Sequence, residues 1–92
     1  METAGRFKNW PVTAGQTVRY FNVPALTSVD VSPGDGGTMN VQVRVSPSGE
    51  LADWPSGSVS AATQDMLEGP IYEIIFSADT ADGIAGLYLG EL

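Results

Sequence analysis

Glycine and proline divide the chain into short segments, and this division constrains the fold more than any other feature of the sequence. The 92 residues include 11 Gly and 6 Pro, and the segments between them are rich in β-branched and aromatic side chains, at intervals of about ten to twelve residues. In residues 38–45, Met or Val at every odd position alternates with a polar residue at every even position. This period of two is typical of a β-strand with one buried face. The sequence therefore favours many short strands and argues against a long helix.

The same features predict strands over residues 16–23, 26–31, 38–45, 70–77 and 84–90. Residues 70–77 are apolar on both faces, so we expect this strand at the centre of a sheet. Residues 32–37 contain three glycines and a proline, and they are predicted as the tip of a hairpin between the second and third of these strands. Residues 60–68 are compatible with a short helix or with an extended edge strand, and we favour the extended alternative.

These strands predict an all-β fold, a small antiparallel β-sandwich or barrel. We expect a single β domain over residues 16–92, preceded by an extended N-terminal arm over residues 1–15, because two glycines and a proline interrupt any regular element there. Phe7 and Trp10 in the arm would be unfavourable in water. The arm should therefore lie on its own domain or on a neighbouring molecule.

The chain has no cysteine and no histidine. These absences exclude disulfide bonds, zinc sites built on Cys and His, the Ser-His-Asp triad and Cys-His nucleophiles, and we expect no cofactor and no metal. A chain of this length buries a modest fraction of its surface when it folds. We therefore expect assembly with other copies to add stability.

Charge is unevenly distributed along the chain. All four Lys and Arg residues lie in residues 1–46, whereas residues 47–92 hold eight acidic residues and no basic one, and the net charge is −7. An acidic protein is repelled by nucleic-acid phosphates and by anionic membranes, and no segment reaches the roughly 18 apolar residues of a membrane helix, so we expect no nucleic acid and no membrane as partner. The asymmetry could bring the N-terminal half of one copy to the C-terminal half of another or dock a basic partner, or the acids could simply favour solubility.

Acidic residues are the remaining candidates for catalysis or metal binding. Residues 79–81 (Asp-Thr-Ala) are similar to the Asp-Thr-Gly triplet of aspartic proteases, but the third residue is Ala and the triplet lies near the end of the chain rather than in its first third. The candidate pairs are Asp79 with Asp82 for a Ca²⁺ ion, and Glu50 with Asp53 or Asp65 with Glu68 as acid and base. Solvated acids are far more common than such sites, so we expect the chain not to be an enzyme.

Several features together resemble small virion proteins of tailed bacteriophages. They are a short acidic all-β chain with an N-terminal arm, the turn at residues 32–37, the valine-rich strand at 39–45, the segment 54–63 and the apolar strand after Gly69 and Pro70, and the resemblance covers about residues 12–78. Within this group the chain is similar to head decoration, or cement, proteins, which sit outside an icosahedral shell, often as trimers, and clamp neighbouring capsomers. The resemblance implies a structural role without enzymatic activity and carries over no catalytic residue.

The expectation is therefore a structural virion protein that decorates and stabilises the exterior of a phage capsid by binding across capsomers. Its expected partners are the major capsid protein and itself, as a homotrimer, and it would be made in the host cytoplasm. The residues expected at the protein interface are Arg6, Phe7, Lys8 and Trp10 in the arm and, secondarily, Trp54 and Pro55, which precede a turn at Gly57. The alternative for Trp54 is a lid on the core. The alternatives are a tail- or fibre-associated joint or carbohydrate binder and, from another class, a carboxylate-dependent hydrolase.

Overall fold

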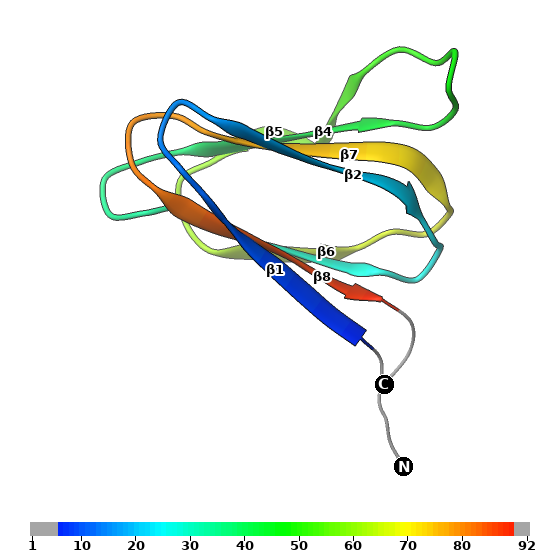
Figure 1. Ribbon diagram of the computed structural model, residues 1–92, viewed down its shortest axis with the longest axis horizontal. Helices are drawn as coiled ribbons and strands as arrows, with labels where there is room; N and C mark the ends of the chain where they lie inside the picture. Colours follow the sequence, from blue (N-terminus) through cyan, green and yellow to red (C-terminus); the bar gives the residue numbers. More distant parts are fainter. Residues whose placement is uncertain (1–5, 90–92) are drawn as a thin grey trace.

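The computed structural model describes residues 6–89, apart from the side chains of residues 6–8, 55, 56 and 89. The strands are β1 (Arg6–Val12), β2 (Thr17–Val23), β3 (Ser28–Ser32), β4 (Met39–Arg44), β5 (Ala52–Val59), β6 (Thr63–Met66), β7 (Ile71–Ala78) and β8 (Gly83–Leu89). They form two four-stranded sheets, β1-β8-β3-β6 and β2-β7-β4-β5, which appear as two stacked layers in Figure 1. The paired strands are antiparallel, which confirms the predicted all-β sandwich. Residues 6–89 include no helix that is long and apolar enough to cross a membrane.

The strand pairing follows a simple order. β1 pairs with β8, β2 with β7, β3 with β6, and β4 with β5. The chain therefore runs as one long hairpin that turns at the β4–β5 connection and is rolled up so that its pairs alternate between the two sheets. This is the arrangement of an eight-stranded jelly roll. Consecutive strands share a sheet only at β4–β5, so the other described connections pass over an end of the sandwich.

The core lies between the two sheets. Its largest fully buried apolar side chains are Phe76, Met39, Ile74, Leu87, Val12, Val23, Val29 and Val41. β4 buries alternate residues as the period of two predicts, but it ends at Arg44, so Val45, expected on the buried face, is 70% exposed. β7 lies between β2 and β4, as expected of a strand that is apolar on both faces.

The prediction of a hairpin at residues 32–37 is wrong. β3 and β4 lie in different sheets, so this segment crosses from one sheet to the other. A Cβ on Gly34 would collide with the carbonyl oxygen of Asp82, and one on Gly37 would lie 2.7 Å from the Cβ of Ala81. The glycines therefore allow close packing against the β7–β8 connection. Turn residues mark a change of direction, but they do not determine whether the flanking strands pair or stack.

Two edge strands differ in how well the sequence predicts them. Residues 60–68 adopt the extended alternative, with β6 paired to β3. Trp54 and Pro55 are extended, as expected for a residue before proline, but the turn expected at Gly57 is an irregularity within β5, where Gly57 has a φ angle of 89° and the register shifts opposite Asn40 and Gln42. Proline is tolerated there because β5 is an irregular edge strand that needs fewer ladder hydrogen bonds.

Part of the expected N-terminal arm is a strand of the sandwich. Residues 6–12 form β1, which pairs with β8 from Arg6 opposite Leu89 to Val12 opposite Gly83. Of the two alternatives for the arm, this segment follows the one in which it folds onto its own domain, and residues 1–5 lie outside the described range. Pro11 argues against a strand in the sequence because proline has no N–H to donate, but an edge strand accommodates a proline.

Candidate docking surface

The residues predicted for a protein interface do not gather on one described surface. Trp10 packs inward, with its ring centroid 5.5 Å from that of Tyr20 and 6.4 Å from that of Phe76. Trp54 also packs against the core, from β5. β1 and β5 are edge strands of different sheets, so the two tryptophans cover the core at separate edges. The side chains of Arg6, Phe7, Lys8 and Pro55 lie outside the described residues.

The acidic residues considered for chemistry are on the surface, and two of them hold other groups in place. Asp82 Oδ1 accepts the backbone N–H of Ala14 at 2.9 Å, and Asp79 Oδ2 accepts a longer bond of 3.4 Å from Thr38 Oγ1. The exposed acids of the other two pairs are Glu50, Asp53, Asp65 and Glu68. Within the described part of the chain, no three His, Cys, Asp or Glu side chains are close enough together to hold a metal ion.

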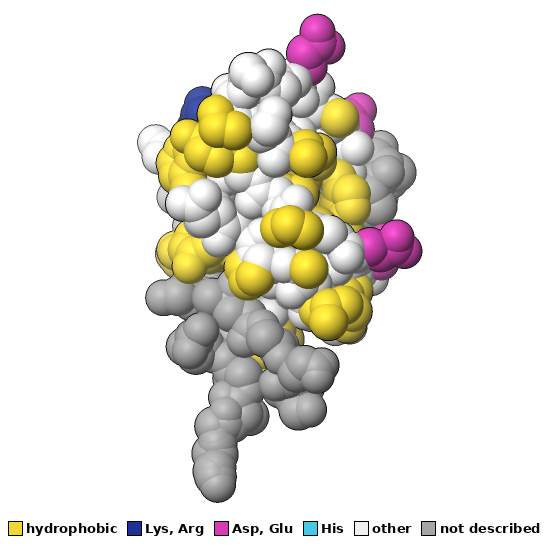
Figure 2. Space-filling view, turned by 90° about the vertical axis from the view of Figure 1, so that its right-hand side faces the viewer, with side chains coloured by type: hydrophobic (Ala, Val, Ile, Leu, Met, Phe, Trp, Pro, Cys, Tyr) yellow, Lys and Arg dark blue, Asp and Glu magenta, His cyan; other side chains and the backbone are white. Residues whose placement is uncertain are grey.

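One end of the sandwich gathers exposed apolar side chains. The β2–β3, β4–β5 and β6–β7 connections meet there, on the right of Figure 1, around an open groove of about 520 Å³. Figure 2 faces this end and shows hydrophobic side chains spread across it. The groove is lined by Asn22, Val23, Pro24, Val45, Ser46, Pro47, Pro70, Ile71 and Tyr72. We call these residues, together with Phe21 and Leu26, the end surface.

Several apolar side chains of the end surface are open to solvent. Val45 is 70% exposed, Leu26 is 51% exposed and Phe21 is 46% exposed. The ring of Phe21 meets that of Tyr72 edge-on, with centroids 5.5 Å apart. Each of the three connections also contributes a proline to the groove. Rings and prolines of this kind have few rotatable bonds, so they lose little conformational freedom when a partner binds.

The β2–β3 connection is held in an unfavourable backbone conformation. Leu26 has a φ angle of 64°, in a region that bulky residues rarely adopt. Asn22, near the end of β2, has a φ angle of 58°, which asparagine adopts more readily. The turn is fixed by the Leu26 N–H, which donates to the Leu67 carbonyl oxygen at 2.9 Å, and by Thr27 Oγ1, which donates to the Pro24 carbonyl oxygen at 2.7 Å. Such strain costs about 1–3 kcal/mol and is concentrated at functional sites. Here it accompanies the exposure of Leu26.

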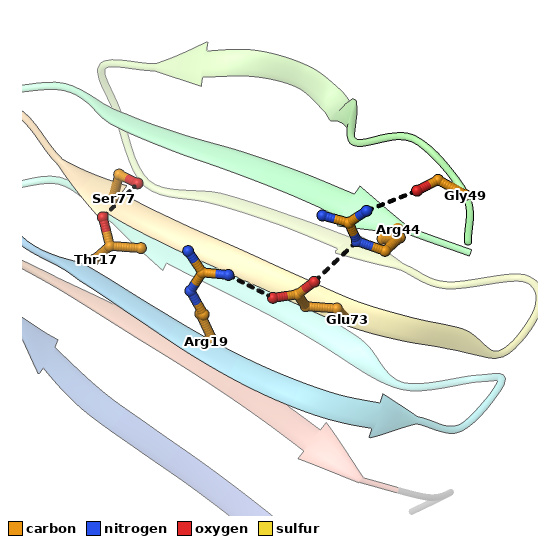
Figure 3. A network of polar contacts seen from close by, with 6 residues as sticks. All are labelled: Thr17, Arg19, Arg44, Gly49, Glu73 and Ser77. Atoms are coloured by element: carbon orange, nitrogen blue, oxygen red, sulfur yellow. Dashed lines mark hydrogen bonds and ion pairs between the residues drawn. The ribbon is translucent and has the colours of Figure 1, made fainter. Parts of the chain in front are cut away.

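A charged network fixes the β4–β5 connection (Figure 3). Glu73 on β7 is 3% exposed, and it accepts Arg19 Nη1 at 2.8 Å and Arg44 Nε at 3.1 Å. Arg44 Nη1 also donates to the carbonyl oxygen of Gly49 at 2.7 Å, so one guanidinium joins β7 to the connection that carries Val45. Burial alone would raise the pKa of Glu73, but the hydrogen bonds and charges of the two arginines outweigh it and lower the pKa.

No protein-family model matches the chain, and no curated protein matches it. The jelly roll itself occurs in viral capsid domains, lectins and cupins, so the fold does not choose among functions. Sequence reasoning missed the end surface because its residues come from three separate connections. The available signal was a proline near the end of an apolar strand in each of them. The fold and the end surface together define a small jelly-roll protein with exposed apolar side chains around a groove at one end.

Proposed function

We propose that the chain is a structural virion protein that decorates and stabilises a phage capsid, and that it docks on the shell through the end surface. The observation that carries the docking is the exposure of Val45 and Leu26 on connections that are held in place, beside the exposed Phe21 of β2. Contiguous exposed apolar patches are typical of protein contact sites. The capsid as partner is supported by the resemblance of residues 12–78 to head decoration proteins.

The stabilisation would come from added interface. A specific protein interface buries about 800 Å² on each partner, and the accessible surface of this chain is 5207 Å², so such an interface would cover roughly 15% of it. Each copy would span a seam between capsomers, and assembly of copies as a homotrimer would link several such contacts. Linked contacts convert a modest affinity into a large avidity.

Co-sedimentation with phage heads that lack small surface proteins tests this proposal. The wild-type protein should bind in a saturable manner, and Val45→Ser should weaken binding by roughly tenfold or more, as at an interface hot spot. Thr13→Ser is the control, because Thr13 is exposed in the β1–β2 connection, at the opposite end of β2 from the end surface, and lines neither that surface nor the hollow at Asp30. Melting temperatures show whether both variants are folded. A wild-type protein that ignores heads, or equal losses in the two variants, would contradict docking through the end surface.

A second candidate is a tail- or fibre-associated protein that binds carbohydrate. It is favoured by a polar hollow of about 290 Å³ lined by Thr38, Asn40, Ser58, Ser77, Ala78 and Asp79. Hydroxyl, amide and carboxylate groups suit hydrogen bonding to sugar hydroxyls. Binding to a glycan that is lost in Asn40→Ala, in a protein that does not bind heads, would favour this candidate over capsid decoration.

A further inference from the structure

Asp30 lies at the middle of the outer face of the β1-β8-β3-β6 sheet. Val29 and Val31, its neighbours in β3, are buried in the core, so Asp30 faces away from it. In register, Asp30 is opposite Gly86 on β8 and Gln64 on β6. Because Gly86 has no side chain, the surface of the sheet is recessed beside the Asp30 carboxylate. An open hollow of about 320 Å³ lies here, lined by Asp30, Ser32, Ala62, Thr63 and Gln64.

The Asp30 carboxylate is short of hydrogen-bond donors. Its Oδ1 is shielded from solvent and has no donor among the described residues. Two side-chain donors of the hollow are directed elsewhere, because Gln64 Nε2 donates to Ser28 Oγ at 2.9 Å and Thr63 Oγ1 donates to the carbonyl oxygen of Ala61 at 2.9 Å. The hollow therefore presents mainly acceptors, and a ligand that fits it must bring donors.

Among the side chains that the structure describes, no basic group pairs with Asp30. Burial raises the pKa of Asp30, as expected for a carboxylate that is partly removed from water. Arg19 and Arg44, the basic residues whose side chains are described, both pair with Glu73 on the other sheet. A cation from another molecule would relieve the cost of desolvation, and the net charge of −7 attracts cations at long range.

Apolar side chains flank the carboxylate along the same face. Met66, opposite Ser28, is 52% exposed, and Ile84, opposite Ser32, is 50% exposed. A polar anchor with apolar surroundings is typical of an interface hot spot. The volume of the hollow is close to the lower limit for ligand sites, so it suits one side chain better than a larger molecule.

We propose that the hollow receives the guanidinium of an arginine side chain from a partner protein, in an ion pair with Asp30. Arginine suits the site because its planar group has five N–H donors and is more weakly hydrated than the ammonium of lysine, so it tolerates apolar neighbours such as Met66 and Ile84. The inference deepens the proposed function, because it predicts that the docking partner presents an arginine side chain. It rests on the proposed function in one respect, namely that the partner is a protein.

Methylguanidinium chloride is the probe for this site, followed by ¹H–¹⁵N NMR of the full chain. Saturable shifts are expected at residues 29–31, 64 and 86, beyond those caused by sodium chloride at equal concentration. Asp30→Asn should weaken this binding by roughly tenfold, the loss expected for charge-assisted hydrogen bonds. Asp53→Asn is the matched control, because Asp53 is an exposed acid on the other sheet and its replacement changes the net charge equally.

Three outcomes would overturn the proposal. They are shifts spread over all acidic residues, equal losses in the Asp30 and Asp53 variants, and local shifts that calcium chloride produces at lower concentration than methylguanidinium does. Head binding separates this proposal from the proposed function. If the probe binds locally but the protein does not bind heads, the Asp30 site is supported and capsid docking is contradicted. Head binding without local shifts removes the Asp30 site alone.

Discussion

Removal of residues 1–12 tests whether β1 is a structural part of the sandwich or a dispensable arm. The deletion takes away an edge strand that pairs with β8 along its length. It removes Val12, which is fully buried, and Trp10, whose ring packs near Tyr20 and Phe76. It also leaves β8, which lies between β1 and β3, with an unpaired edge.

The expected loss is comparable to the whole stability of the fold. Burial of Val12 contributes about 2 kcal/mol. Trp10 is only partly buried, so the lower end of the range for removal of a large aromatic side chain applies, about 3 kcal/mol. A chain of 92 residues is stable by about 5–14 kcal/mol, and the deletion also removes the β1–β8 hydrogen bonds. We therefore expect the shortened chain to be unfolded or close to it.

Urea unfolding followed by far-ultraviolet circular dichroism measures this loss, since removal of Trp10 would alter a fluorescence signal whether or not the chain folds. Val12→Ala serves as a graded comparison and should lower the free energy of unfolding by about 2 kcal/mol. The assignment of β1 to the sandwich would be refuted by a shortened chain that unfolds cooperatively with a free energy within about 1 kcal/mol of the full chain. That result would restore an arm that is free to bind a neighbour.

Three further predictions concern single residues. Gly83→Ala should destabilise the fold by about 1–3 kcal/mol, because the new Cβ would collide with Met39 Sδ and lie 2.9 Å from a backbone oxygen of β3. Gly69→Ala is the control: Gly69 has open space around it, so this variant should leave the urea midpoint nearly unchanged. Glu73→Gln should flatten the loss of stability in acid: the pKa of Glu73 is lowered in the folded protein, so its contribution is present above the pKa of the unfolded chain and disappears as the pH falls through the folded pKa. If the free energy of unfolding of Glu73→Gln falls as steeply with decreasing pH as that of the wild type, this prediction is contradicted. Asp30→Asn should raise the melting temperature at pH 7, because the pKa of Asp30 is raised in the folded protein and its charged form therefore disfavours folding. The gain should vanish below the unfolded pKa, and a lower melting temperature at pH 7 would show that the Asp30 charge is compensated.

The sequence predicts individual strands where burial leaves a local pattern. β4 shows a period of two because one face is buried, and β7 has apolar residues on both faces because it lies between two strands and faces the core. Glu73 in that apolar strand was a signal that we did not use, since a buried acid requires partners. Those partners, Arg19 and Arg44, lie on β2 and β4, so no local pattern could identify them.

The assignment of strands to sheets leaves no local pattern in the sequence. Residues 32–37 have the composition of a hairpin turn, but the same residues also serve a crossover that packs against the β7–β8 connection. Val45 continues the alternation of β4 in the sequence and yet becomes exposed, because the strand ends one residue earlier. The end surface escaped prediction for the same reason, since each of its residues has the local character of a strand end or a loop.

The topology places the two proposed contacts on separate parts of the sandwich. The end surface lies where the β2–β3, β4–β5 and β6–β7 connections meet, and Asp30 lies on the outer face of the β1-β8-β3-β6 sheet. The two sites share no lining residue, so occupation of one leaves the other accessible, and a single copy could touch two neighbouring molecules. Binding across a seam between capsomers requires such a pair of contacts, because one contact alone attaches the protein without joining its neighbours. The avidity of many copies on a shell depends on both contacts being engaged in the same geometry.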